Sequence, residues 1–243
     1  MALPFFYKAD IDVAATTVVL DEDTSKHIVQ VLRMQNGEQL QLTDGKGNLF
    51  TCEITDDNRK KCAVAIKQTT NYKPPTTNIT IAISLLKNAN RFEWFLEKAT
   101  EIGVTQIIPL VCERTEKTAF KFERMKSILV SAMLQSQQCW LPEMGEPVRY
   151  KNFIAAGSAA QKFIAHCEDE NNKVSLTSKL LNLPVRQAGP STSKLILIGP
   201  EGDFTAAEIE LALQNNFIPV SLGDTRLRTE TAGVVAASLL SLL

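Results

Sequence analysis

Near its carboxyl end the chain reads Leu195-Ile-Leu-Ile-Gly-Pro-Glu-Gly-Asp-Phe-Thr205, a sequence typical of a strand, a tight turn and the start of a helix. The apolar run from Leu195 to Ile198 has the length and composition of a buried strand, and Gly199-Pro200 ends it in a tight turn. Thr205-Ala-Ala-Glu208 then has the capping-box spacing that opens a helix. In open α/β folds, ligands bind at the carboxyl ends of the strands, where such turns present free backbone amides.

A second stretch repeats this pattern and reads Leu222-Gly-Asp-Thr-Arg-Leu-Arg-Thr-Glu-Thr-Ala232. The short strand Ile218-Pro-Val-Ser-Leu222 precedes it, Gly223 starts a turn, and Thr229 leads into an apolar helix. Two strand-end loops this close in sequence predict two walls of one pocket. As an isolated tetrapeptide, Gly199-Pro-Glu-Gly202 is equally compatible with a plain turn.

The composition is that of an ordinary globular protein. The chain has 243 residues, of which 44% are apolar and 22% charged, enough for one large or two small domains. No apolar run reaches membrane-spanning length, and the amino terminus lacks the pattern of a signal peptide. Five scattered cysteines without a Cys-x-x-Cys pair favour reduced thiols and argue against a structural zinc site. A cytoplasmic protein is therefore expected.

The charge pattern leaves the partner open. A formal net charge of −1 neither supports nor excludes RNA, because phosphate contacts need only a local basic stripe. The one compact basic run, Arg59-Lys-Lys61, follows acidic residues and is interpreted as a solvated hairpin tip. His166 ends an expected core strand and is interpreted as a core residue. The sequence has no P-loop, no Ser/His/Asp pattern and no metal-ligand spacing, so no metal is expected.

Residues 1–72 predict a small β-barrel with one inserted helix. Turn signals such as Asn36-Gly37 and Asp44-Gly-Lys-Gly47 separate short β segments, and the apolar spacing in 25–33 predicts the helix. Asn71-Tyr-Lys-Pro-Pro-Thr-Thr77 is a stiff linker that marks a domain boundary. The predicted strands are 5–7, 16–20, 38–43, 49–54 and 62–66.

Residues 73–243 predict a mainly parallel α/β sheet, because strands alternate with helices. Two stretches, 142–160 and 167–193, lack periodicity and are expected to be loops with marginal helix. The last segment, 232–243, is apolar on every side and predicts a helix buried in its own sheet, in a subunit interface, or both. The expected strands are 79–85, 106–111, 162–166 and 195–198, and the expected helices are 91–102, ending at Gly103, and about 121–136.

Short motifs follow one another in order along the chain. They are His27-x-x-x-Val-Leu-Arg33, Asp44-Gly-x-Gly47, Leu85-Leu-Lys87, Lys98-Ala-Thr-Glu-Ile-Gly-Val104, Ile108-Pro-Leu110, Glu113-Arg-Thr115, Gln135-Ser136, Leu141-Pro142, Gly199-Pro-Glu-Gly202, Leu222-Gly223 and Leu227-Arg-Thr-Glu-Thr-Ala232. With these motifs the chain resembles, over nearly its whole length, the RsmE family of 16S rRNA (uracil-N3)-methyltransferases. The chain departs from the family pattern at Asp203, where a second glycine is usual, and at Arg226, which occupies an apolar slot.

The resemblance implies an α/β protein of SPOUT type. Residues 1–72 would be a PUA-like, RNA-binding β-barrel, and residues 73–243 a methyltransferase domain with a C-terminal trefoil knot, a rare exception to unknotted topology. The family implies S-adenosyl-L-methionine as cofactor, a homodimer, and methylation of N3 of one uridine in the 16S rRNA of the small ribosomal subunit, uridine 1498 in the family. The alternatives are a SPOUT methyltransferase acting on another rRNA or tRNA site and a non-catalytic RNA-binding protein.

The resemblance also implies the site residues. RNA contacts are expected at His27, Arg33, Lys87 and Arg114. Cofactor contacts, largely through the backbone, are expected from Leu197, Ile198, Gly199, Pro200, Glu201, Gly202, Ser221, Leu222, Gly223, Leu227, Arg228, Thr229, Thr231 and Ala232. Glycines in these loops would let the backbone approach the ligand closely.

Two side chains are expected to take part in the chemistry. Methyl transfer to N3 requires positioning and removal of the N3 proton, and it places negative charge on the uracil carbonyl oxygens. Arg228 is expected to stabilise that charge, and Glu230 to accept the proton or to orient other groups. The alternative for Arg228 is a structural salt bridge with Glu230 or Glu201. Because N3 lies on the pairing edge of uracil, the target must be unpaired or extruded.

Overall fold

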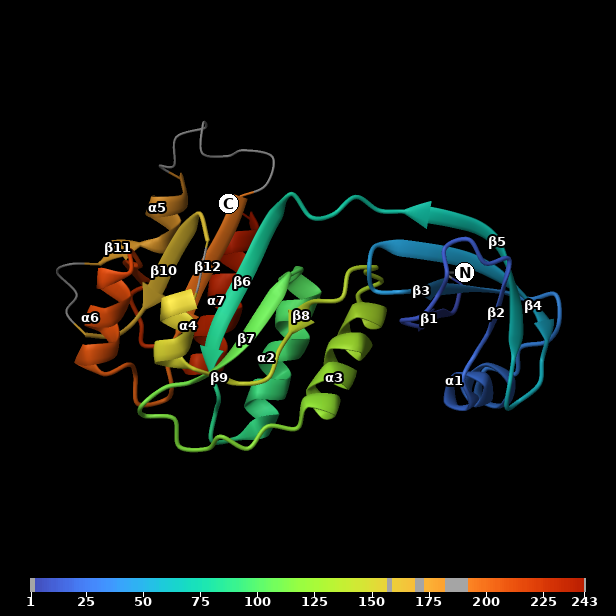
Figure 1. The fold of residues 1–243 in the computed structure, drawn as a ribbon, viewed down its shortest axis with the longest axis horizontal. Helices are drawn as coiled ribbons and strands as arrows, with labels where there is room; N and C mark the ends of the chain where they lie inside the picture. The colour runs from blue at the N-terminus through green and yellow to red at the C-terminus, as the bar shows by residue number, and fades with distance from the viewer. Residues whose placement is uncertain (1–2, 157–158, 169–172, 182–191, 243) are drawn as a thin grey trace. The chain divides into compact units, whose positions relative to one another are not determined.

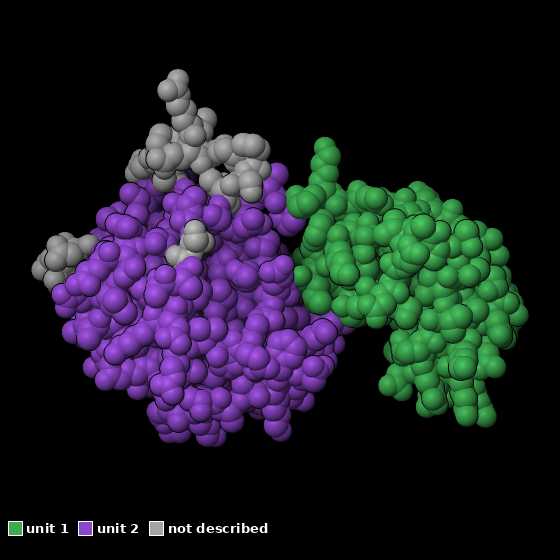
Figure 2. All heavy atoms as spheres, in the orientation of Figure 1, with its two compact units in different colours: residues 1–74, 133–141 green, residues 75–132, 142–243 purple. Residues whose placement is uncertain are grey.

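The computed structural model describes residues 3–156, 159–168, 173–181 and 192–242. The chain divides into two compact units, one of residues 1–74 and 133–141 and the other of residues 75–132 and 142–243 (Figure 2). No helix in the described part of the chain is both long and apolar enough to cross a membrane.

The first unit is built on a five-stranded sheet with the order β1-β3-β4-β5-β2 (Figure 1). Its strands are β1 (Phe5–Tyr7), β2 (Thr17–Val19), β3 (Gln39–Thr43), β4 (Asn48–Asp56) and β5 (Ala63–Asn71). The predicted inserted helix is present as α1 (Glu22–Lys26), which continues into one π-helical turn, η1 (His27–Val31). Arg59-Lys-Lys61 forms the exposed turn between β4 and β5, as expected of a solvated hairpin tip.

Residues 133–141 belong to the first unit, although the sequence analysis assigned only residues 1–72 to it. Backbone hydrogen bonds hold this segment: Gly47 N donates to Cys139 O over 2.8 Å, and Leu141 N donates to Gly45 O over 2.9 Å. Gly47 has a φ of 91°, and a side chain there would overlap the ring of Trp140. These contacts link positions far apart in sequence, so local pattern does not reveal them.

The second unit contains a sheet in which every described strand pair is parallel, as the sequence predicts. The strand order is β11-β13-β10-β12-β6-β7-β8, and β9 pairs with β7. The strands are β6 (Thr77–Ser84), β7 (Gln106–Val111), β8 (Glu143–Met144), β9 (Val148–Arg149), β10 (Gln161–Ala165), β11 (Val174–Ser175), β12 (Thr192–Ile198) and β13 (Ile218–Ser221). Each of the central strands β10, β12 and β6 is therefore hydrogen-bonded to a parallel neighbour on both of its edges.

Helices pack on the parallel sheet and bury its apolar faces (Figure 1). The helices are α2 (Ala89–Ile102), α3 (Phe122–Gln135), α4 (Tyr150–Ala156), α5 (Leu176–Leu181), α6 (Ala206–Gln214) and α7 (Thr229–Leu242). One core joins Leu195 and Leu197 of β12 to side chains of α4 and α6. The helix α7 contacts α2, β6 and β12, so the apolar terminal helix docks on its own sheet. Gly233 allows this close approach, because a Cβ there would lie 2.6 Å from the Phe95 ring.

The two stretches without periodicity contain short helices, in agreement with the expected marginal helix, and short strands, which correct the expectation of loops. The first includes β8, β9 and α4, and the second includes β11 and α5. Residues 157–158, 169–172 and 182–191 of these stretches lie outside the described residues. The helix α4 buries Tyr150, Phe153 and Ile154, but its seven residues are too few to establish a helical period in the sequence.

Candidate cofactor pocket

A pocket of about 810 Å³ lies at the carboxyl ends of β10, β12 and β13, three neighbouring parallel strands. This volume is within the range of roughly 300–1,000 Å³ that small-molecule sites occupy. Three strand ends supply its walls: 165–167 after β10, 198–203 after β12, and 220–229 after β13. The position is the one at which parallel α/β sheets bind ligands.

The loop after β12 is held by its own packing and by the start of α6. A Cβ on Gly199 would lie 3.1 Å from the Phe204 ring, so a larger residue would crowd the packing inside the loop. Thr205 and Glu208 form the predicted capping box at the start of α6. The Glu208 carboxylate also accepts a 2.9 Å hydrogen bond from the backbone N–H of Glu113. The loop is therefore a fixed wall.

Asp203 joins two walls of the pocket. Its φ of 65° lies in the left-handed region, where a glycine would fit without strain. Its carboxylate accepts hydrogen bonds from the backbone N–H of Cys167 over 2.7 Å and of Phe204 over 2.8 Å. Asp203 thus keeps a glycine-like backbone and ties the loop after β12 to the end of β10.

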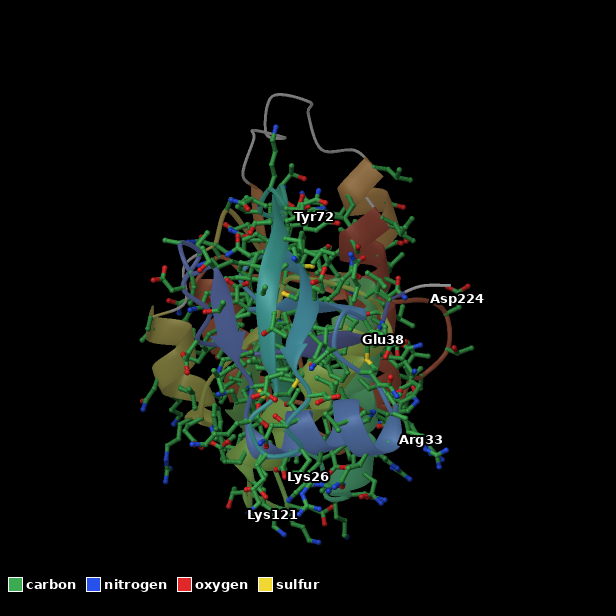
Figure 3. All side chains as sticks on the ribbon, turned by 90° about the vertical axis from the view of Figure 1, so that its right-hand side faces the viewer. Lys26, Arg33, Glu38, Tyr72, Lys121 and Asp224 are labelled. Carbon is green, nitrogen blue, oxygen red and sulfur yellow. The ribbon has the colours of Figure 1, made fainter. Side chains whose placement is uncertain are left out.

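The loop after β13 is more open. Gly223 has a φ of 140°, and a Cβ there would meet no protein atom within 4 Å. The backbone conformation itself therefore requires glycine, and the space in front of it is free for a ligand. Asp224 follows on the exposed part of this loop (Figure 3).

Arg91, in the first turn of α2, lies between two carboxylates of the site. Its Nη1 is 3.3 Å from Glu201 Oε1, and its Nε is 3.7 Å from Glu230 Oε1. Glu230 is only 6% exposed, and its Oε2 has no hydrogen-bond partner among the described residues. The salt bridge between Arg228 and Glu201 or Glu230, the alternative considered for Arg228, is not formed among the described residues; both carboxylates pair with Arg91.

Most of the predicted cofactor residues line this one pocket. They are Ile198, Gly199, Pro200, Glu201, Ser221, Leu222, Gly223, Leu227, Arg228, Thr229 and Ala232. Leu197, Gly202, Thr231 and the predicted catalytic Glu230 are described but do not line it. The Leu197 side chain lies in the core, and the Gly202 carbonyl accepts a 2.8 Å hydrogen bond from Arg114.

The four predicted RNA-contacting residues divide between the units. His27 and Arg33 lie in the first unit, and both are exposed; Arg33 has a φ of 57° and follows η1 (Figure 3). Lys87 and Arg114 lie in the second unit. Lys87 pairs with Glu116 at 2.7 Å, and Arg114 donates to the carbonyls of the loop after β12. Arg114 therefore supports the cofactor pocket from outside.

The third wall of the pocket and the ion pairs of Arg91 were not predicted from the sequence. His166, interpreted as a core residue, lines the pocket beside Cys167. Burial lowers the pKa of His166. An arginine in the first turn of a helix opposes the helix dipole, so Arg91 carried a weak signal of carboxylate partners elsewhere in the chain. The pairing Ala165↔Ile198 brings the third wall to the pocket, and sequence pattern does not specify strand order.

Comparison with known proteins identifies the family. The RNA methyltransferase domain family matches residues 73–241, and the RNA methyltransferase PUA domain family matches residues 20–67. The chain belongs to the RNA methyltransferase family. Ribosomal RNA small subunit methyltransferase E of Synechocystis sp. is 30% identical over 229 residues, which are 93% of this chain and 73% of that protein.

Solved structures of this family have the same fold. The crystal structure of a probable rRNA-methyltransferase from Porphyromonas gingivalis has a TM-score of 0.85 and 40% identity, covering 97% of this chain and 95% of that one. Ribosomal RNA small subunit methyltransferase E from Neisseria gonorrhoeae, bound to S-adenosyl methionine, has a TM-score of 0.82 and 28% identity, covering 98% and 96%. The resemblance to RsmE proteins and the combination of a PUA-like unit with a parallel α/β unit are confirmed.

Proposed function

We propose that the protein transfers the methyl group of S-adenosyl-L-methionine to N3 of one uridine in the 16S rRNA of the small ribosomal subunit. The observation that carries this proposal is the pocket of about 810 Å³ at three adjacent strand ends in a member of the RNA methyltransferase family. Its Neisseria gonorrhoeae relative binds the same cofactor.

The pocket fits this cofactor. The open space in front of Gly223 and the strand-end loops at 198–201 and 221–223 offer backbone groups on two sides. The segment 227–229 closes a third side. S-adenosyl-L-methionine would supply an electrophilic methyl group on its sulfonium. The contacts expected from Leu197, Gly202 and Thr231 remain predictions.

Arg228 is the proposed catalytic residue. Its side chain is exposed at the pocket wall and has no ion pair among the residues that the structure describes. The guanidinium is free to donate hydrogen bonds to the uracil carbonyl oxygens, on which negative charge develops as N3 loses its proton. Stabilising that charge lowers the barrier to transfer.

Glu230 is proposed as a positioning residue. The sequence left two roles open, proton acceptor or orienting group. Its carboxylate is buried, faces Arg91 and does not line the pocket, which supports the orienting role. Together with Glu201 it fixes the Arg91 guanidinium, and this fixes the segment that carries Arg228.

The first unit is proposed to bind the rRNA through its PUA-like fold, with His27 and Arg33 as contacts. Both side chains are exposed on or beside η1. From the resemblance to the family we also propose that the protein is a homodimer and contains the trefoil knot. A cytoplasmic location is proposed as well, because ribosomal subunits are found there. The exposed Trp94 on α2 is compatible with a subunit contact.

Reverse transcription of small-subunit rRNA tests the proposal. A methyl group on N3 blocks pairing, so copying stops at the modified uridine. We expect one stop to disappear in a strain that lacks the gene, to return with the wild-type gene, and to stay absent with Arg228→Ala. Calorimetry should show unchanged cofactor affinity for Arg228→Ala. A stop that persists in the deletion strain would refute this target, and a lost stop in another rRNA or in a tRNA would assign the substrate there.

A further inference from the structure

The walls of the pocket carry more positive charge than its internal pairs neutralise. The pocket is lined by four cations, Arg91, Lys173, Arg226 and Arg228, and by three carboxylates, Glu201, Asp203 and Asp224. Arg91 is paired with Glu201, and the Asp203 carboxylate accepts two backbone hydrogen bonds. Of the other four groups, none forms an ion pair with a residue that the structure describes. Three cations and two carboxylates, Asp203 and Asp224, are therefore left without an ion pair in the described lining, which holds one more cation than carboxylates.

The unpaired cations Arg226 and Lys173 come from different segments and line the same pocket as Cys167. Arg226 is exposed on the loop after β13, and the half-buried Lys173 directly precedes β11. Burial and the Asp203 carboxylate raise the pKa of the Cys167 thiol, while Arg226 and Lys173 act in the opposite direction. Both cations are thus close enough to influence the end of β10.

The cofactor does not account for this charge. S-adenosyl-L-methionine carries a sulfonium, an ammonium and a single carboxylate, so it is itself cationic and offers one anionic group. An RNA strand brings one phosphate per nucleotide, and unpaired arginine and lysine side chains are the groups that bind phosphates. Unpaired positive charge on the pocket wall fits the second substrate.

We propose that Arg226 and Lys173 hold RNA backbone phosphates beside the target uridine, while Arg228 faces the base. This inference rests on the proposed function and specifies how its substrate is held. It gives a role to Arg226, the arginine that stands in an apolar slot of the family pattern. An extruded nucleotide needs its flanking phosphates fixed so that N3 meets the methyl group in line.

The test compares Arg226→Gln and Lys173→Gln with the charge-conserving Arg226→Lys. The control Lys179→Gln removes a cation that lines a separate cavity with Gln161 and Lys162, at the amino end of β10. Methyl transfer to small subunits lacking the modification is measured at several KCl concentrations. For Arg226→Gln we expect the KM for RNA to rise about three- to tenfold and kcat to change little. The negative slope of log(kcat/KM) against log[KCl] should become shallower by about 0.7. Arg226→Lys and Lys179→Gln should keep the wild-type slope.

Two further measurements separate this inference from the proposed function. Cofactor affinity by calorimetry should stay within about twofold of wild type; an equal loss of cofactor and RNA affinity would assign Arg226 to the cofactor carboxylate and overturn the proposal. Binding of an rRNA fragment without turnover, titrated with KCl, reports the phosphate contact even if the reaction proves different. An unchanged salt slope in Arg226→Gln, or a wild-type protein that binds cofactor but no RNA, would also overturn it.

Discussion

Replacing Arg91 by methionine should loosen the cofactor pocket, because this arginine pairs with Glu201 in the loop after β12 and with Glu230 in the first turn of α7. Two unit charges at the 3.7 Å that separates Arg91 Nε from Glu230 Oε1 attract by about 4.5 kcal/mol at an effective dielectric constant of about 20. The Arg91 side chain is 38% exposed, and solvent screening reduces the expected net loss to about 1–2 kcal/mol.

This loss should appear in two measurements. By calorimetry, the Kd for S-adenosyl-L-methionine should rise about 5- to 30-fold if the whole loss falls on the arrangement of the two loops. By urea denaturation, the free energy of unfolding should fall by a similar amount, because Glu230 is left buried without its cation.

Matched variants decide whether the ion pairs are the cause. Adding Glu230→Gln to Arg91→Met removes the unpaired buried charge and should recover part of the lost stability. Arg124→Met breaks another pair to α2, with Glu93, outside the pocket lining, and should leave the cofactor Kd unchanged. The reasoning is refuted if Arg91→Met keeps both the cofactor Kd and the unfolding free energy, or if the double variant is no more stable than Arg91→Met.

Three further predictions concern the stability of the second unit and are tested at Asp203, Lys194 and Gly233. Asp203→Ala places an apolar residue at a φ of 65° and removes two accepted hydrogen bonds, so urea denaturation should show a loss of about 2–3 kcal/mol, and Asp203→Gly a smaller one. Burial lowers the pKa of the Lys194 amine below 10.5, so the amine binds a proton more tightly in the unfolded chain than in the folded protein. The free energy of unfolding of the wild type, relative to that of Lys194→Met, should therefore rise as the pH approaches 10.5, as measured by denaturation curves. Gly233→Val forces a side chain against the Phe95 ring and should lower the unfolding free energy by about 1–3 kcal/mol, whereas Gly145→Ala, with no atom within 4 Å of the new Cβ, should be neutral in the same assay.

Elements with strong local signals are the ones that the sequence predicts well. The strand β7 lies where its apolar run predicts it, and Gly103 ends α2 with a φ of 92°, as expected of a C-terminal glycine. The two-residue strands β8, β9 and β11 were missed, and α4 and α5 were anticipated only as marginal helix, because such short elements bury too few side chains to show a period. Contacts with other elements hold them in place, such as Tyr150 Oη of α4 donating to the Glu208 carbonyl of α6 over 2.7 Å.

The sequence likewise predicts only some parts of the pocket. Glycine turns after β12 and β13 mark two of its walls in the sequence, because a turn is a local property. The third wall and the ion pairs depend on strand order and on contacts between distant segments; Arg91 and Glu201 are separated by 110 positions. Local sequence pattern does not predict contacts between residues so far apart in the chain. For this reason neither His166 nor Arg91 could be assigned to the pocket from the sequence.

Asp203 shows how a departure from a glycine pattern can leave a binding loop intact. The position demands a positive φ, which most side chains resist, but aspartate tolerates it because its short carboxylate can bond to nearby backbone N–H groups. Here the carboxylate bonds to its neighbour Phe204 and also to Cys167 on the end of β10. The second bond gives the loop an anchor that glycine could not supply. The substitution therefore preserves the course of the backbone along the pocket and strengthens the contact between two of its walls.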